Sequence, residues 1–416
     1  MAISPAARNA PTRLPSAYAA PLIERVLLVV LFVAVLLSSV SFIEPSPHDI
    51  LMGLLAFVCL LAGVRIERKA VLLFLLLLIW NVSGLLSLMN APDNSRAIQY
   101  TVTSFYLSIA AVVFACLFAQ NSMSRLSAMR SAYIASAVLA AIVGIIGYFR
   151  VIPGMFELYG RAVGMFKDPN VFGPFLIWPA LFVATRALTR GFTVRDLGIL
   201  VILSAGIFLS FSRGAWAHFA LSGAVMFALL LVTAPNPRIR MRLILLALVG
   251  LVVVGFLLAV LLSIDSVRDM FALRAQAIQS YDVGEGGRFR LQELAIGALL
   301  DFPAGMGPFE FTRLYGIQQH NVYLQGFIVY GWIGGVAYIL MVLSTLLIGL
   351  RTVLIATPWQ PYLLTAFAAF AGELGEGFII DTDHWRHFYL LLGIMWGLFA
   401  ATTNYQRQAE LHLAVR

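Results

Sequence analysis

The chain has 416 residues, of which 61% are hydrophobic and only 12% are charged. Soluble globular domains carry about a quarter charged residues, so this composition excludes an ordinary soluble enzyme and indicates a polytopic membrane protein. The net charge of +8 would favour a nucleic-acid partner in a soluble chain. Here the basic residues follow a membrane pattern instead, and we expect no nucleic-acid partner.

Apolar runs of the length that spans a bilayer recur along the whole chain. We predict an all-α, polytopic membrane helical bundle with about twelve transmembrane helices between two short tails, 1–25 and 405–416. The bundle occupies 26–404, and its first run is interpreted as a retained helix rather than a cleaved signal sequence. The predicted spans are 26–43, 50–64, 70–89, 98–119, 131–149, 171–187, 197–211, 214–234, 243–264, 322–350, 361–380 and 388–404.

Arginine and lysine gather in the connections after alternate spans and in the two tails. These places hold most of the 28 Lys and Arg residues, and the positive-inside rule assigns them to the cytoplasm. We therefore predict that both tails are cytoplasmic. Some basic residues fall on the other side, where topology gives no reason for them and an anionic partner is expected. They are Arg161, Lys167, Arg213, Arg288 and Arg290.

The interval 265–319 is the longest polar stretch of the chain, and we predict that it forms a loop on the outer, non-cytoplasmic side with helices of its own. Its first part has apolar residues at helical spacing, which indicate an amphipathic helix on the membrane surface. The residues concerned are Val267, Met270, Phe271, Ala277, Ile278 and Tyr281. Glycines at 284, 286 and 287 interrupt that pattern, and 289–300 is predicted to form a second helix.

A histidine and an asparagine, His320 and Asn321, open the span 322–350. Polar side chains at the mouth of a membrane helix cost free energy unless they face water or a polar cavity, so both are candidate functional residues. Histidine also has a pKa suited to general base catalysis. Glu373 and Glu376 stand three residues apart inside the span 361–380. We expect them to face the bundle interior or the outer cavity and to pair with an arginine.

Several motifs around His320 resemble those of bacterial O-antigen ligases. His320-Asn321, followed after nine residues by Gly331-x-x-Gly334, is similar to the His-Asn/Ser/Gln-x9-Gly-x-x-Gly pattern of that family. Further agreement lies in Phe211-Ser212-Arg213-Gly214, in Gly287-Arg288-Phe289 and in Phe302-Pro303-x-Gly305-x-Gly307-Pro308. With signatures of one branch at 164–173 and 381–387, the resemblance covers about residues 150–400. The wider family includes O-antigen polymerases and protein O-oligosaccharyltransferases.

The resemblance implies a membrane glycosyltransferase that needs no metal and no other cofactor. Its donor would be a glycan on undecaprenyl diphosphate, and its acceptor lipid A core or another glycan, at the periplasmic face of the bacterial inner membrane. On the matching positions, His320 is the base that activates the acceptor, and Arg213 and Arg288 bind the diphosphate in bidentate fashion. Arg161 and Arg290 are weaker candidates for the same task. The residues expected to support the site are Asn321, Lys167, Asp168, Glu373 and Glu376.

The same residues also admit structural interpretations. A histidine at a helix end can act as a cap, Arg213 could extend to the membrane interface, and Arg288 and Arg290 could be a solvated loop pair. The stretch from Lys167 to Asn170 favours a turn by its own chemistry. Four residues resemble a metal cluster, but we expect a structural turn that orients Trp385 at the membrane interface. These four are Asp381, Asp383, His384 and His387.

Two alternatives to a ligase follow from the same features. An O-antigen or exopolysaccharide polymerase of the same family would share the motifs and the chemistry. A transporter or flippase of lipid-linked glycans would also be a basic-lined bundle of about twelve helices, but transporters tend to have broken helices in two related halves with a site near the midplane. This chain concentrates its unexplained polar residues at one face, which favours an enzyme. The sequence leaves the sugar, the acceptor and the oligomeric state open.

Overall fold

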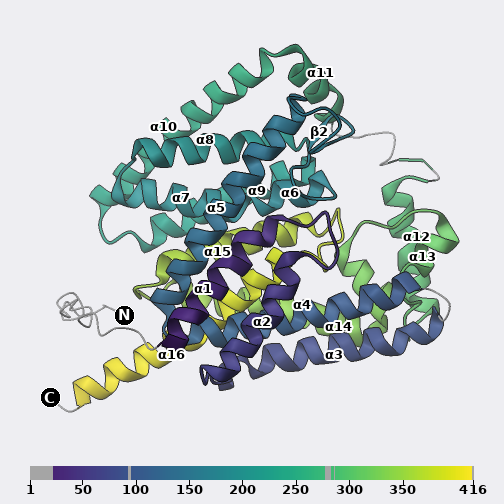
Figure 1. Ribbon diagram of the computed structural model, residues 1–416, viewed down its shortest axis with the longest axis horizontal. Helices are drawn as coiled ribbons and strands as arrows, with labels where there is room; N and C mark the ends of the chain where they lie inside the picture. The colour runs from purple at the N-terminus through teal and green to yellow at the C-terminus, as the bar shows by residue number, and fades with distance from the viewer. Residues whose placement is uncertain (1–21, 92–94, 277–282, 285, 415–416) are drawn as a thin grey trace.

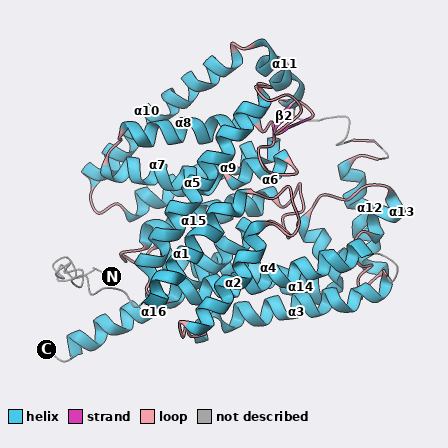
Figure 2. Ribbon diagram, in the orientation of Figure 1, coloured by secondary structure: helices cyan, strands magenta, loops and turns pink. Residues whose placement is uncertain are grey.

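The computed structural model describes residues 22–91, 95–276, 283–284 and 286–414. Within them the protein is an all-α bundle, and the predicted fold class is confirmed (Figures 1 and 2). The strands of the described chain are two short antiparallel ones, β1 (Glu157–Leu158) and β2 (Arg161–Ala162), which pair Leu158 with Arg161.

Each predicted span overlaps a helix. These helices are α1 (Leu22–Leu36), α2 (Pro47–Leu61), α3 (Val71–Ser87), α4 (Ser95–Ala119), α5 (Ser122–Tyr148), α6 (Pro169–Phe175) followed by α7 (Ile177–Arg190), α8 (Val194–Leu209), α9 (Arg213–Thr233), α10 (Pro237–Leu262), α14 (Val322–Val353), α15 (Gln360–Glu376) and α16 (Arg386–Ala414). Short 3-10 helices, η2 (Leu37–Ser39), η3 (Arg68–Ala70) and η4 (Leu88–Asn90), extend or precede some of them.

Nine segments of the described chain are long and apolar enough to cross a membrane, fewer than the twelve or so predicted. The three predicted spans that fall short are α2, α8 and α15, with 15, 16 and 17 residues. At 1.5 Å per residue such helices extend about 22–26 Å, somewhat less than the roughly 30 Å of a hydrocarbon core. The protein is a multi-pass membrane protein whose helices differ in how far they reach across.

Small residues bring the central helices close together. A Cβ atom on Gly397 of α16 would lie 2.6 Å from the carbonyl oxygen of Ala115 in α4, and one on Gly372 of α15 would lie 2.8 Å from the carbonyl oxygen of His218 in α9. Glycine at these positions therefore permits backbone approach, as is usual where membrane helices pack. In contrast, α10 buries only two side chains, Leu243 and Leu261, and runs along the edge of the bundle (Figure 1).

The connections between helices lie at two ends of the bundle. The end with 149–168, 210–212, 263–276, 286–321 and 377–385 is called the loop face here. It carries α11 (Asp265–Arg274), α12 (Arg288–Asp301) and α13 (Glu310–Tyr315), toward the right of Figure 1. Hydrogen bonds join its segments, among them Asn90 Nδ2 to the Gly305 carbonyl at 2.6 Å. The other end, called the opposite face, holds the start of α1 and the end of α16. There Arg125 binds Glu24 at 2.9 Å.

The described residues of the long interval 265–319 are largely helical, as predicted. Helix α12 confirms the helix expected over 289–300. Helix α11 accounts for the first half of the expected amphipathic helix, while Ala277, Ile278 and Tyr281 lie outside the described residues. Helix α13, which has six residues, was not predicted, because a single turn shows no clear apolar period.

Two of the glycine motifs meet in space. Helix α14 is interrupted at Gly331, whose φ of 70° is left-handed. A Cβ atom at this residue would lie 2.7 Å from the Pro303 carbonyl oxygen, and the Trp332 amide donates to that oxygen at 2.9 Å. Gly305 in turn lies against the backbone of 329–331. The loop after α12 therefore packs its backbone into the break of α14, which fixes α12 relative to the residues that begin α14.

Candidate functional site

His320 lies at the loop face, one residue before the N-cap of α14. Asn321 is that N-cap, since its side-chain oxygen accepts hydrogen bonds from the Tyr323 and Leu324 amides at 3.0 and 3.1 Å. Its Nδ2 atom donates to the Phe378 carbonyl at 3.3 Å. His320 has a left-handed φ of 50°, a conformation that non-glycine residues adopt rarely. The cap and the turn place the imidazole beside the 377–385 loop.

The imidazole of His320 faces the carboxylate of Asp381. Nδ1 lies 3.7 Å from Oδ2, and the two side chains are 35% and 13% exposed. Neither carboxylate oxygen has a hydrogen-bond partner of ordinary geometry in the described chain. Burial raises the pKa of the Asp381 carboxyl, and the contact with His320 partly opposes that shift. An aspartate at Nδ1 can orient the ring and stabilise its protonated form, which leaves Nε2 for a substrate proton.

Helix α12 begins with Arg288 and is hydrogen-bonded to the backbone of His320. Gln292 donates from Nε2 to the Phe378 carbonyl at 3.2 Å and to the His320 carbonyl at 3.5 Å. Arg288 is half-buried and precedes Gln292 by four residues, so the two share a face of α12 about 6 Å apart along its axis. Arg290 instead is exposed and pairs with Glu293 at 2.6 Å on the helix surface. Arg288 thus lies on the face of α12 that carries Gln292, whereas Arg290 is engaged on the helix surface.

Arg213 and Arg161 meet at the junction between α8 and α9. Arg213 is the first residue of α9, behind the Ser212 N-cap, and its Nη1 donates to the Gln276 carbonyl at 3.0 Å. Arg161 is buried, with Nε donating to the Ser210 carbonyl at 2.8 Å and Nη2 to Asn170 at 2.7 Å. These contacts hold the turn from which Arg213 projects. Arg161 therefore supports the junction, and its role as a phosphate ligand stays a prediction.

Lys167 and Asp168 make structural contacts in the loop that carries Arg161. Lys167 pairs with Glu44 at 2.7 Å, and both side chains are largely exposed. Asp168 caps α6 by accepting a hydrogen bond from the Asn170 amide at 2.7 Å. The turn expected from their sequence is present, and the supporting roles of Lys167 and Asp168 at the site stay predictions.

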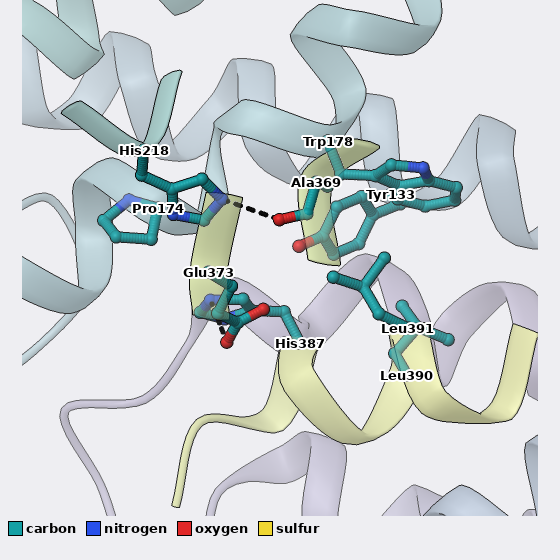
Figure 3. A pocket seen from close by; sticks show the side chains of 9 residues that line it. All are labelled: Tyr133, Pro174, Trp178, His218, Ala369, Glu373, His387, Leu390 and Leu391. Atoms are coloured by element: carbon teal, nitrogen blue, oxygen red, sulfur yellow. Dashed lines mark hydrogen bonds and ion pairs between the residues drawn. The ribbon is translucent and has the colours of Figure 1, made fainter. Parts of the chain in front are cut away.

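Glu373 and Glu376 lie inside the bundle and pair with histidines. Glu376 binds Nδ1 of His218 at 2.8 Å, and Glu373 lies 3.5 Å from Nε2 of His387. The expected pairing with an arginine is wrong, because the close packing of α15 on α9 brings His218 within reach. Figure 3 shows His218, Glu373 and His387 around a small cavity that also involves Tyr133 and has room for about one water molecule.

The stretch 381–387 does not form one cluster. Asp383 accepts hydrogen bonds from His384 at 3.0 Å and from the Tyr100 hydroxyl at 2.6 Å, while His384 Nε2 lies 3.0 Å from the Tyr100 carbonyl. Trp385 is buried within the protein, and its expected orientation at a membrane interface stays a prediction. Asp381 faces His320, and His387 lies deeper, near Glu373. Across the described ranges, no group of three or more His, Cys, Asp or Glu side chains is arranged to hold a metal ion.

The contacts of Asp383 and His384, called the closed pair here, determine the charges that these two side chains carry. Burial by itself raises the pKa of Asp383, but the charge and hydrogen bond of His384, with the Tyr100 hydroxyl, bring this pKa below its usual range. Burial lowers the pKa of His384, yet the Asp383 carboxylate outweighs it and the pKa is raised. The pair is therefore held as an ion pair inside the loop face.

Three partners of the site were missed in the sequence. Asp381 was noted as part of a branch signature, a seeming metal cluster and a suspected turn, but not as the partner of the His320 ring, which its carboxylate faces. Gln292 could have been found as the polar residue one turn after Arg288. Tyr100 carries no such indication, since it contacts Asp383 from a helix 283 residues away in the chain.

Taken together, the fold and the site define a multi-pass membrane protein with a histidine, a carboxylate and arginines gathered at one face. Residues 198–339 match the family model described as O-Antigen ligase. The matched stretch runs from α8 into α14 and includes Arg213, Arg288 and His320, whereas Arg161 and Asp381 lie outside it. A search of curated proteins gives no match.

The match confirms the resemblance and supports membership of the O-antigen ligase family. A glycosyltransferase-like activity, as a ligase or a related polymerase, follows from that family. In general the family works on lipid-linked glycans, with lipid A core as an acceptor.

Proposed function

We propose that the protein transfers a glycan from undecaprenyl diphosphate to a hydroxyl of lipid A core, at the periplasmic face of the bacterial inner membrane. One observation carries the proposal. His320 faces Asp381 at 3.7 Å, and the helix that begins with Arg288 is tied to the His320 carbonyl through Gln292. A candidate base and a candidate phosphate ligand therefore share one rigid frame.

The reaction is a displacement at the anomeric carbon of the donor sugar. The acceptor oxygen forms a bond to that carbon, and the bond from the carbon to the diphosphate oxygen breaks. Undecaprenyl diphosphate leaves with the bonding electrons. Nε2 of His320 takes the hydroxyl proton, while Asp381 stabilises the resulting imidazolium. General base catalysis of this kind contributes roughly 10²–10⁴ in rate.

The arginines stabilise the negative charge that grows on the leaving diphosphate. Arg288 approaches from α12, and Arg213 stands at the first turn of α9, where the helix dipole also favours an anion. Each guanidinium can bind phosphate oxygens through two parallel hydrogen bonds. This fixed positive charge supplies what a divalent cation would otherwise supply, so we propose that transfer needs no metal ion.

The proposed orientation rests on the distribution of basic residues. The connections rich in arginine lie at the opposite face together with the start of α1 and the end of α16. By the positive-inside rule that face, and both tails, are cytoplasmic. The loop face is then periplasmic.

The decisive assay uses purified protein in detergent, where transport across a membrane has no meaning. Lipid-linked glycan and lipid A core are mixed with the protein, with and without EDTA, and glycan transfer is measured. We expect transfer that survives EDTA and is lost in His320→Ala. His412→Ala, at an exposed position near the C-terminal end of α16, is the matched control and should retain activity.

Other outcomes of this assay overturn parts of the proposal. Ladder-like growth of the lipid-linked glycan without transfer to lipid A core would identify a polymerase. Loss of transfer in EDTA that returns with a divalent cation would contradict the metal-free mechanism. No transfer to any acceptor, with glycolipid movement in reconstituted vesicles, would identify a transporter.

A further inference from the structure

A groove of about 490 Å³ opens at the opposite face of the bundle, between α5, α7 and α8. None of the residues proposed for glycan transfer lines it. Its mouth carries three arginines, one from each helix: Arg130, Arg186 and Arg195. Arg195 lies in the first turn of α8 and Arg186 about one turn before the end of α7, while Arg130 lies about two turns inside α5, so the positive charge gathers toward this end of the bundle.

The positive charge of the mouth is only partly neutralised. Asp196 is the one acidic residue lining the groove, and it binds Arg186 at 2.5 Å. Within the described residues, Arg130 donates to the hydroxyls of Ser127 and Ser131, at 3.3 and 3.4 Å, and its guanidinium lies over the Phe182 ring at 5.5 Å, but it binds no carboxylate. Arg195 is exposed and makes no hydrogen bond or ion pair with the described part of the chain. Two arginines can therefore receive an anion.

The wall below the arginines is apolar. Ile134, Val138 and Ile142 follow Arg130 at intervals of four residues along α5, and Phe182 of α7 and Ile199 of α8 line the other side. From Arg130 to Ile142 the helix rises about 18 Å, which is close to the depth of one leaflet of a bilayer with a core of roughly 30 Å. A free anion would leave this wall unoccupied.

We propose that the groove binds an anionic phospholipid of the membrane leaflet at the opposite face. The lipid phosphate lies between Arg130 and Arg195, and an acyl chain runs along the apolar stripe of α5. Basic pockets between transmembrane helices recognise anionic lipid head groups through this combination of charge and apolar depth. The site is separate from the proposed transfer site, and its occupant belongs to the other leaflet.

The test measures lipid binding directly. Delipidated protein in detergent is titrated with phosphatidylglycerol or with phosphatidylethanolamine, and bound lipid is quantified by native mass spectrometry. We expect saturable binding of phosphatidylglycerol, weakened roughly fivefold by Arg130→Gln or Arg195→Gln and about 25-fold by both, since each basic residue contributes about one such step. Arg130→Lys should retain most of the affinity. Arg240→Gln, at the start of α10 and away from the groove, should change nothing.

A second variant distinguishes a lipid from a free phosphate ion. Ala135 lines the apolar wall and is exposed, so Ala135→Trp fills the groove and leaves the arginines in place. Loss of phosphatidylglycerol binding with an unchanged unfolding temperature supports the proposal. The proposal would be overturned if both lipids bound equally well, or if the double arginine variant bound phosphatidylglycerol as well as the parent protein does. It would also be overturned if inorganic phosphate competed with the lipid while Ala135→Trp left binding unchanged. Glycan transfer is not the readout, so this test stands apart from the proposed function.

Discussion

The loop face contains two histidine–aspartate pairs that differ in how many of their side-chain polar atoms have hydrogen-bond partners in the protein. In the first, His384 binds Asp383 at 3.0 Å, Tyr100 occupies the same carboxylate, and the other ring nitrogen meets the Tyr100 carbonyl. In the second, His320 lies 3.7 Å from Asp381, whose oxygens lack hydrogen bonds of ordinary geometry in the described chain. Both aspartates come from one short loop, yet only the pair of His384 and Asp383 is closed, in the sense that its polar atoms are hydrogen-bonded within the protein.

This difference in hydrogen bonding suggests that one pair stabilises the fold and the other takes part in the reaction. A pair whose polar atoms are all satisfied cannot accept a substrate proton without breaking hydrogen bonds inside the protein, which is costly in a buried setting. A pair with an exposed ring and an unsatisfied carboxylate is ready for a proton from outside. We therefore assign the closed pair to stability and the open pair to the proposed transfer reaction.

Substituting the two histidines should separate these roles most strongly. His320→Ala is expected to lower the rate of glycan transfer by roughly 10²–10⁴, the contribution of a general base, with little change in unfolding temperature. His384→Gln is expected to destabilise the fold by about 1–3 kcal/mol, because it disturbs a buried hydrogen-bonded pair. Transfer rates and thermal unfolding of the purified variants decide the matter. Equal rate losses in both variants at matched stability would contradict the distinction.

A smaller but similar contrast is expected at the start of α12. Arg288→Ala should lower transfer by roughly 10²–10³, the usual cost of losing one preorganised charge ligand. Arg288→Lys should recover little of it, because an ammonium lacks the planar fork. Arg290, two residues away and paired with Glu293 on the surface, is the matched control, and Arg290→Ala should keep nearly normal kcat/KM. If Arg290→Ala lowered the rate of transfer more than Arg288→Ala does, Arg290 and not Arg288 would be the phosphate ligand.

The helical bundle was predictable from the sequence, but the contacts among the candidate site residues were not. Apolar runs located every main helix, and the motif around His320 placed the candidate base at the start of α14, where its catalytic role stays a prediction. Arg161 was predicted as a weaker phosphate candidate, and its contacts with Ser210 and Asn170 could not be predicted, because the sequence shows a charge without its folded neighbours. The same limit applies to Glu373 and Glu376, whose histidine partners come from α9 and α16.

The two aspartates offer a milder test of the same contrast. Asp381→Asn should lower kcat by roughly 10–100-fold, the range found when a residue that orients a functional histidine is removed. Its unfolding temperature should stay close to that of the parent protein, because few hydrogen bonds are lost. Asp383→Asn should show the reverse, with a lowered unfolding temperature and a smaller change in kcat. Thermal unfolding and steady-state kinetics on the same preparations provide the comparison.

The closed pair also predicts how stability depends on pH. The pKa of Asp383 is lowered in the fold, so its stabilising contribution is present above its unfolded pKa and is lost as the pH falls through the lowered value. The pKa of His384 is raised, so its contribution is complete below its unfolded pKa and is lost as the pH rises through the raised value. The pair should stabilise most between roughly pH 4 and 6.5.

Unfolding temperatures of the parent protein and of Asp383→Asn, measured from pH 5 to pH 9, test this prediction. The difference between the two proteins should be largest near pH 5–6, the region where both partners carry their charge, and should shrink toward pH 9. A difference that is constant over this range would mean that the hydrogen bonds of Asp383, and not its charge, stabilise the loop face.

The smallest effect on activity is expected from cysteine variants that report only on which side of the membrane the loop face and the opposite face lie. Cys59 and Cys116 are buried, so a cysteine introduced at an exposed site can be labelled selectively. Tyr159 in the loop between β1 and β2 is 85% exposed at the loop face, and Arg240 is exposed at the opposite face. An impermeant thiol reagent added to intact cells should label Tyr159→Cys and leave Arg240→Cys unlabelled until the membrane is opened. The reverse pattern would place His320 and the proposed arginines in the cytoplasm, where a periplasmic ligase could not use them.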